Sequence, residues 1–295
     1  MGTSAENPGA LDRSHAVLES SWWSALLIGS LFLASYAVVL GRLAKQWWTD
    51  SDMSHGMFVP VLVAYMVWEK REELARSKPN HNLFGLCLMV IGAVLLCVGP
   101  PGLDTYASVT RAAFVISLTG GLLFLRGLST IRILLYPLVL MLLMLPMPGF
   151  LLQALTFPLQ LTASRLAESI LEILGFSVLR EGNVLMLPGQ TLNIAEACSG
   201  LRSIMGLTFL GQAYAYLFDS RPWMRAAIGV MVIPIAVVAN ALRIVATAIA
   251  SYHNRAWGHG IYHESTGWIV FVVAFSSILL AHFVMKKIWP AGKRI

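Results

Sequence analysis

Residues 226–250 read AAIGVMVIPIAVVANALRIVATAIA, an apolar run that holds one charged side chain, Arg243. A transmembrane helix needs about 20 mostly apolar residues to cross the hydrocarbon core of a bilayer. This run is therefore predicted to span a membrane as an α-helix. Seven similar runs occur along the chain, at residues 22–41, 54–69, 83–99, 107–125, 131–147, 199–217 and 265–285. The sequence thus predicts an all-α polytopic membrane protein with about eight transmembrane helices.

The composition agrees with a membrane protein and argues against several other classes. Hydrophobic residues make up 57% of the chain, charged residues make up 12%, and the mean hydropathy is +0.70. Soluble globular proteins average roughly 45–50% apolar and about 25% charged residues. A soluble enzyme and a disordered regulator are therefore not expected. Three cysteines are also too few for the disulfide framework of a secreted scaffold.

The basic residues predict the orientation of the chain. The formal net charge is +6, and Lys and Arg lie mostly between the apolar runs. With the N-terminus inside, the inner segments carry thirteen of them and the outer segments five. The positive-inside rule then places both termini in the cytoplasm, and it explains the charge better than a nucleic-acid partner does. We expect residues 1–21 to be a cytoplasmic segment, without a cleavable signal, and residues 286–295 to be a basic cytoplasmic tail.

The longest connection, residues 148–198, is predicted on the outer face. Its first part, residues 151–174, mixes polar and apolar side chains. We prefer an amphipathic helix at the outer interface, because a ninth span would place the basic tail outside; the ninth span remains the alternative. Turn signals at residues 181–183 and 188–189 separate short apolar stretches, which predicts a small β-hairpin or meander that caps the outer face.

Three chemically active side chains are predicted to meet at the outer face. Cys198 comes directly before the span at 199–217, where a helix N-terminus favours a thiolate. Arg243 lies seven residues, or about 10 Å, from the outer end of its span, within reach of the boundary. His263 directly precedes the last span, again on the outer side. The predicted topology alone brings these three groups to one level of the membrane.

These groups together suit acyl transfer. A thiolate is a nucleophile, and histidine serves as its base and then as the acid for the leaving amine. An arginine in a dry site stabilises the oxyanion, and one such donor is worth about 3–4 kcal/mol. The sequence therefore predicts a cysteine protease or transpeptidase.

Three motifs resemble those of the exosortase/archaeosortase family of membrane cysteine transpeptidases. They are EACSGLR at residues 196–202, Asn240-x-x-Arg243 and His263-x-x-x-Gly267, in the family's order and separation. The resemblance covers most of a transmembrane domain at 22–285, and its specific part is residues 192–271. It implies that Cys198 is the nucleophile, Arg243 the catalytic arginine and His263 the histidine. Histidine in that place resembles the bacterial form, which is linked with exopolysaccharide.

The resemblance also implies a class of substrates. These are exported proteins with a C-terminal signal of the PEP-CTERM kind, made of a Pro-Glu-Pro motif, a transmembrane helix and a basic tail. Cleavage would leave an acyl-enzyme on Cys198, which an unknown acceptor (lipid, glycan or water) would resolve. The site would face the periplasm at a bacterial inner membrane. No cofactor and no nucleic acid is expected, nor is the C-terminal soluble domain of some members, because the chain ends at Ile295.

Several other polar residues have roles that the sequence leaves open. Glu196 orients His263, binds substrate or is a solvated carboxylate. Arg202 lines the site or has an orienting or structural role. Asn240 is expected to hydrogen-bond between helices. His259 is an alternative to His263. A zinc site built on His253, His259 and His263 is not expected, because Gly258 and Gly260 disfavour the helix that their spacing would need.

Two functions without this chemistry remain as alternatives. A polytopic transporter would explain the many spans, but transporters usually show internal repeats and polar sites at the midplane of the bilayer. We find no repeat, and the polar residues gather near one face. A scaffold for exopolysaccharide assembly would tolerate the loss of Cys198. Cys87 and Cys97 are interpreted as packing residues of one span.

Overall fold

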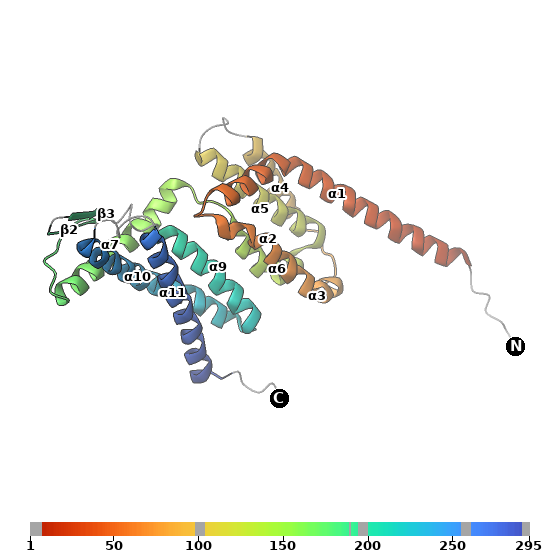
Figure 1. Cartoon of the computed structure of the whole chain (residues 1–295). Helices are drawn as coiled ribbons and strands as arrows, with labels where there is room; N and C mark the ends of the chain where they lie inside the picture. The colour runs from red at the N-terminus through yellow and green to blue at the C-terminus, as the bar shows by residue number, and fades with distance from the viewer. Residues whose placement is uncertain (1–7, 98–103, 189, 194–199, 255–260, 291–295) are drawn as a thin grey trace. The chain divides into compact units, whose positions relative to one another are not determined.

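The computed structural model describes residues 8–97, 104–188, 190–193, 200–254 and 261–290 (Figure 1). This part of the chain is mostly helical and forms two compact units, residues 1–45 and 46–295. Its α-helices are α1 (Pro8–Thr49), α2 (Val59–Glu69), α3 (Arg71–Arg76), α4 (Leu83–Cys97), α5 (Asp104–Arg126), α6 (Leu128–Met141), α7 (Gly149–Ile173), α9 (Gly200–Phe218), α10 (Pro222–His253) and α11 (Ile261–Ile288). Two short 3-10 helices, η1 (Ser54–Met57) and η2 (Leu142–Met144), complete the helical part.

The described helices support a multi-pass membrane protein. Four of them are long and apolar enough to cross a bilayer, over Leu26–Thr49, Ala107–Arg126, Pro222–His253 and Ser265–Ile288. A fifth span is obtained if α6 with η2 and α7, which meet at an angle of 92°, are counted as one broken span. The prediction of eight spans is not confirmed. The 11 residues of α2 and the 15 residues of α4 fall short of the about 17–25 that a span needs.

Glycines bring α4 and α5 into close contact. A Cβ placed on Gly85 would collide with the backbone of Phe124, and one placed on Gly92 would collide with Oγ of Ser117. A Cβ on Gly120 would lie 2.8 Å from the backbone nitrogen of Met89. Membrane helices commonly use small residues in this way, because apolar side chains gain little by leaving lipid and close backbone packing must hold the helices together.

A three-stranded antiparallel sheet follows α7, which confirms the predicted small β-meander, whereas its place on the outer face stays a prediction. Its strands β1 (Leu179–Glu181), β2 (Val184–Leu187) and β3 (Gln190–Asn193) lie in the order β1-β2-β3. Gly182, with φ of +60°, provides the left-handed turn between β1 and β2. Buried residues of α7, β2 and α10 form one apolar core, comprising Ala163, Ala167, Leu171, Leu185, Leu187, Ala241, Ile244, Val245 and Ala248.

The polar residues of α7 bind this sheet. Nε of Arg180 donates to the carboxylate of Glu168 at 2.7 Å. The side chain of Asn183 accepts a hydrogen bond from Ser164 at 3.0 Å and donates one to Gln160 at 3.2 Å. The mixed polarity of residues 151–174 thus reflects the anchoring of a sheet. The interfacial position that we inferred from that pattern stays a prediction.

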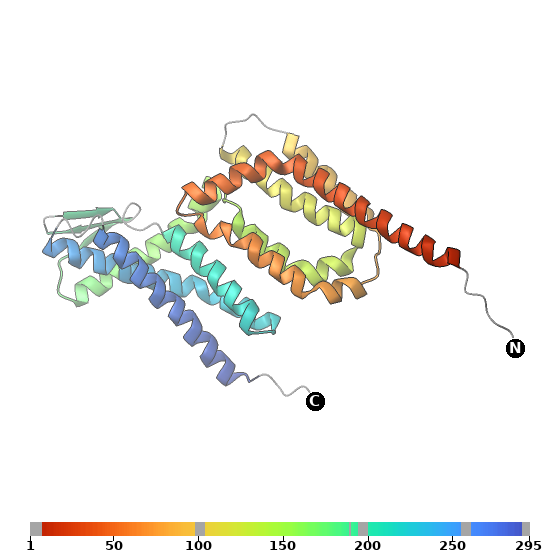
Figure 2. The ribbon, with the colours of Figure 1, turned by 45° about the vertical axis from the view of Figure 1, so that its right-hand side comes forward.

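The helices α9, α10 and α11 pack side by side (Figure 2). Their shared core is apolar, with Leu207 and Ala215 from α9, Ala274 and Ile278 from α11, and buried residues of α10 between them, namely Met224, Ile228, Val232, Ala236 and Ala239. The three motifs of the resemblance lie in or directly before these three helices. The bundle is therefore the frame on which a site would be built.

Candidate active site

Close contacts fix the register between α9 and α10. A Cβ on Gly211 would lie 3.3 Å from Val232, and a Cβ on Gly229 would lie 2.6 Å from the amide nitrogen of Gln212. The two helices are therefore antiparallel. Gly200, the first residue of α9, lies eleven residues before Gly211, and Arg243 lies eleven residues after Val232. Arg243 is accordingly level with the start of α9.

A second contact fixes the register between α9 and α11. A Cβ on Gly206 would lie 3.4 Å from the ring of Phe271, and these two helices run parallel. Gly267 lies four residues before Phe271, and Arg202 lies four residues before Gly206. The same level of the bundle thus contains the first turn of α9, Arg243 of α10 and Gly267 of α11.

The guanidinium of Arg243 lies directly against α11. A Cβ on Gly267 would lie 3.2 Å from its Nη2 and 3.3 Å from its Cζ, and Arg243 is only 9% exposed. His263 comes four residues before Gly267 in α11, so helix geometry places the two residues on one face, one turn apart. The structure therefore brings together the segments of the second and third motifs.

Other parts of the predicted site fall outside what the structure describes. Cys198, Glu196 and His259 lie outside the described residues, and Cys198 precedes the first residue of α9 by two positions. The backbones of Arg202 and His263 lie in α9 and α11, whereas their side chains are not among the described ones. The contact of a thiol with an imidazole therefore stays a prediction.

Asn240 and His253 are described. Asn240 is half-buried, one turn before Arg243, and its bridging role stays a prediction. Nδ1 of His253 lies 3.0 Å from the carbonyl oxygen of Ile249 in its own helix. Among the described residues, no group of three His, Cys, Asp or Glu side chains is placed to hold a metal ion.

Two hydroxyl residues beside Arg243 were missed by the sequence reasoning. Thr247 and Ser251 follow Arg243 at steps of four residues, and they are 3% and 5% exposed. Neither hydroxyl has a hydrogen-bond partner among the residues that the structure describes. The signal in the sequence was the four-residue spacing of Arg, Thr and Ser within an otherwise apolar run.

A buried polar network lies at the opposite end of the bundle. Asp219 accepts hydrogen bonds from Nε and Nη2 of Arg221 at 2.9 Å and 2.6 Å, and from the backbone nitrogen of Arg221 at 2.9 Å. Nε2 of His282 lies 3.1 Å from the same carboxylate, and its Nδ1 lies 2.8 Å from the hydroxyl of Tyr214. Arg221 also donates to the carbonyl of Trp289. The network joins the ends of α9, α10 and α11.

The charge of Asp219 is strongly favoured in this network. Hydrogen bonds from the Arg221 guanidinium hold the pKa of the Asp219 carboxyl well below its usual range, although burial opposes them, and the pKa of Arg221 is raised in turn. An ionised Asp219 only accepts, so Nε2 of His282 donates to its carboxylate. Gly200 and Phe218, at the two ends of α9, are about 27 Å apart along the helix. The network around Asp219 is therefore remote from the motifs, and we assign it a structural role.

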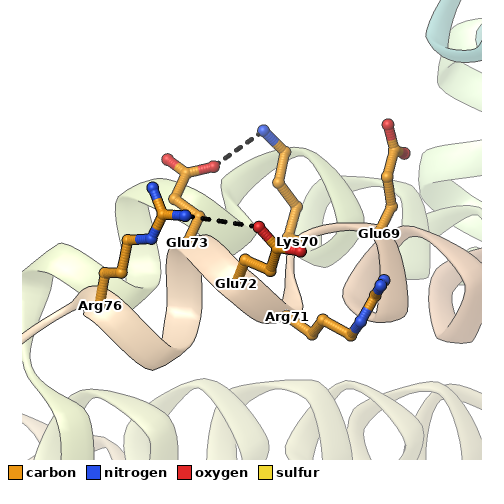
Figure 3. A pocket seen from close by; sticks show the side chains of 6 residues that line it. All are labelled: Glu69, Lys70, Arg71, Glu72, Glu73 and Arg76. Atoms are coloured by element: carbon orange, nitrogen blue, oxygen red, sulfur yellow. Dashed lines mark hydrogen bonds and ion pairs between the residues drawn. The ribbon is translucent and has the colours of Figure 1, made fainter.

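An open hollow on α2 and α3 is also remote from the motifs (Figure 3). Six charged residues line it: Glu69, Lys70, Arg71, Glu72, Glu73 and Arg76. Two ion pairs form within it, Lys70 with Glu73 at 3.0 Å and Arg76 with Glu72 at 3.5 Å. Its charges balance and it holds no motif residue, so we assign no catalytic role to it.

Comparison with known families agrees with the motifs. A family model described as transmembrane exosortase matches residues 47–280, which is most of the chain. The match includes α9, α10 and α11 up to residue 280, together with the segments that hold all three motifs. No curated protein and no solved structure matches the chain.

Proposed function

The chain belongs to the transmembrane exosortase family, and from this premise we propose that it is a membrane-embedded cysteine protease/transpeptidase that cleaves C-terminal sorting signals of exported proteins. The observation that carries the proposal is the position of Arg243. Its guanidinium is buried against Gly267, at the level of the first residue of α9. Two motif segments thereby meet at the helix that begins two residues after Cys198.

The proposed reaction begins with the thiol of Cys198 giving its proton to His263. The thiolate attacks the carbonyl carbon of the scissile peptide bond, so a C–S bond forms and the carbonyl oxygen becomes an oxyanion. Arg243 stabilises this oxyanion. The intermediate then collapses, the C–N bond breaks, and His263 gives its proton to the leaving amine.

The second half of the reaction releases the exported protein. A nucleophilic acceptor gives its proton to His263 and attacks the thioester, the C–S bond breaks, and the thiol of Cys198 is restored. Water as the acceptor gives hydrolysis, whereas an amine or a hydroxyl of a lipid or glycan gives transfer. Only the acceptor differs between these outcomes, so the same residues serve both.

The burial of Arg243 supports its proposed role. A charged donor acts most strongly on a developing oxyanion where water is excluded and the local dielectric constant is low. Arg243 is 9% exposed, and its guanidinium is confined by the backbone of α11 at Gly267. Such a donor is already oriented before the charge develops.

The substrate is proposed to bind from the side. Its C-terminal helix would enter laterally between the spans, with its basic tail at the cytoplasmic face and its cleavage motif at the periplasmic face of the inner membrane. This arrangement follows from the predicted orientation, in which both termini are cytoplasmic. The outer segment with α7 and the sheet would form the lip of the opening.

Processing of a co-expressed reporter tests the function. The reporter carries a Pro-Glu-Pro motif, an apolar helix and a basic tail at its C-terminus. We expect Cys198→Ala to abolish processing and Arg243→Lys to reduce it by about 10²-fold or more, the typical cost of one oxyanion donor. Mass spectrometry of the trapped intermediate should show the acyl group on Cys198.

Cys97→Ala is the matched control, since Cys97 is an exposed thiol of α4. It should process the reporter like the unmodified protein. Full processing by Cys198→Ala would refute the proposed chemistry and would favour the scaffold instead.

A further inference from the structure

Thr247 and Ser251 extend the site beyond Arg243 along α10. Four residues turn an α-helix by slightly more than one full turn, so the three side chains follow one another along one side of the helix. All three are at least nine-tenths buried. From Arg243 they lead toward the end of α10 at His253, which is the predicted outer end.

The two hydroxyls behave differently from other helical hydroxyls of this chain. A serine or threonine within a helix commonly donates to the carbonyl three or four residues earlier. Nine described residues do so, namely Ser30, Ser35, Thr110, Thr119, Thr156, Thr162, Ser164, Thr208 and Ser277. Thr247 and Ser251 do not, and the described part of the chain offers them no other partner.

Buried hydroxyls without a partner destabilise a folded protein. Their hydrogen bonds to water are lost and nothing replaces them. Native structures hold few such groups, and each of them calls for an explanation. Two in successive turns, directly after a buried arginine of the family motif, point to a ligand that supplies the missing partners.

We propose that Thr247 and Ser251 form a subsite that hydrogen-bonds the main-chain carbonyls of an extended substrate segment next to the scissile bond. This inference rests on the proposed function. Residues four apart in a helix are separated by about 6 Å along the axis. Carbonyls two residues apart on one side of an extended chain are separated by about 6.6–6.8 Å, so successive hydroxyls match successive carbonyls of that side.

The direction of the subsite identifies which part of the substrate it binds. Arg243 faces the carbonyl that is attacked, and the hydroxyls lead from it toward the outer surface. The exported protein lies on that side, whereas the substrate's own helix lies in the membrane. Thr247 and Ser251 therefore bind the acyl side of the scissile bond. Because these hydroxyls bind the substrate's main chain, they do not discriminate between substrate side chains.

The test measures substrate use and stability in the same variants. Thr247→Val, Ser251→Ala and the double variant are compared with the unmodified full-length protein in lipid nanodiscs. The probe is a synthetic peptide with a Pro-Glu-Pro motif, an apolar helix and a basic tail. We expect KM to rise about fivefold for each single variant and about twentyfold for the double variant, as the loss of one or two hydrogen bonds predicts. The rate of alkylation of Cys198 by iodoacetamide should not change.

Thr130→Val and Thr208→Val are the matched controls. The hydroxyl of Thr130 in α6 is also buried and without a partner among the described residues, and that of Thr208 is bound to its own helix. Both variants should keep the KM of the unmodified protein. The midpoint of thermal unfolding should stay constant or rise in Thr247→Val as in Thr130→Val, because each removes a buried hydroxyl that lacks a partner.

Two results would overturn the subsite. One is an unchanged KM in the double variant while Cys198→Ala is inactive, which leaves the proposed function intact. The other is a lower unfolding midpoint in Thr247→Val than in Thr130→Val, which would assign the hydroxyl a structural role whatever the peptide does. Processing by Cys198→Ala would instead contradict the proposed function itself.

Discussion

The packing of Arg243 explains why residue 267 is a glycine. The guanidinium lies where a side chain at position 267 would begin, with 3.2 Å between Nη2 and a Cβ placed there. This separation is tighter than an ordinary contact, so Gly267→Ala should displace the guanidinium by a few tenths of an ångström. Since a misplacement of about 1 Å can cost 10²-fold in rate, we expect reporter processing to fall by roughly tenfold.

Gly206→Ala separates this effect from a general loss of helix packing. Its Cβ would meet only the ring of Phe271, at an ordinary 3.4 Å, in the same bundle. Both alanine variants should fold, and only Gly267→Ala should lower kcat while KM stays constant. Equal kcat values in the two variants would show that Gly267 does not position Arg243.

At the scale of elements, the β-meander is held to α7 by polar contacts. The ion pair between Arg180 and Glu168 is only 20–24% exposed and is a charge-assisted hydrogen bond of 2.7 Å. Glu168→Gln keeps the shape of the side chain but removes its negative charge. It should therefore destabilise the sheet by about 1 kcal/mol. Hydrogen exchange of the backbone amides in β1 and β2 should become about fivefold faster.

Glu172→Gln is the control for this change. Glu172 lies one turn further along α7 and is exposed, so its charge should contribute little to the sheet. If the amides of β1 and β2 exchanged equally fast in both variants, the ion pair would not be what holds the sheet to α7.

The elements differ in how well the sequence predicts them. The runs at 107–125, 226–250 and 265–285 correspond to α5, α10 and α11 within four residues, because hydropathy dominates there. The run at 131–147 corresponds to α6 with η2 within three residues, and the chain then bends by 92° before α7. The prolines at positions 146 and 148 mark this break, because the residue before a proline is disfavoured in a helix.

The candidate site was predictable only in part. Arg243 and the segment at Gly267 were identified because a charged residue within a span and a recognisable motif both leave a signal in the sequence. Their mutual contact depends on the register of α9, α10 and α11, which small residues such as Gly211 set through packing. Thr247 and Ser251 can be recognised as candidate site residues only once their burial is known. From the sequence alone, hydroxyls in an apolar run are expected to hydrogen-bond to their own helix.

At the scale of the whole molecule, the helices that carry the motifs are joined again at their other end by Asp219. This carboxylate is 3% exposed and is bound by Arg221 and His282. Asp219→Asn would remove the charge that both partners face and leave the Arg221 cation without its counter-ion. Since this change removes one partner of an ion pair that joins three helices, the free energy of unfolding in detergent should fall.

The same carboxylate makes stability depend on pH in a defined direction. Arg221 lowers the pKa of Asp219 in the folded protein, so folding favours the ionised form. The resulting stabilisation is complete above the unfolded pKa of about 4 and is lost as the pH falls further toward the folded pKa. Unfolding measured from pH 7 down to pH 3 should show a smaller acid-dependent loss of stability in Asp219→Asn than in the unmodified protein. Glu72→Gln, which removes an exposed ion pair, should lose as much stability in acid as the unmodified protein does. If Asp219→Asn showed the same pH dependence as the unmodified protein, the charge of Asp219 would not be what holds the three helices together.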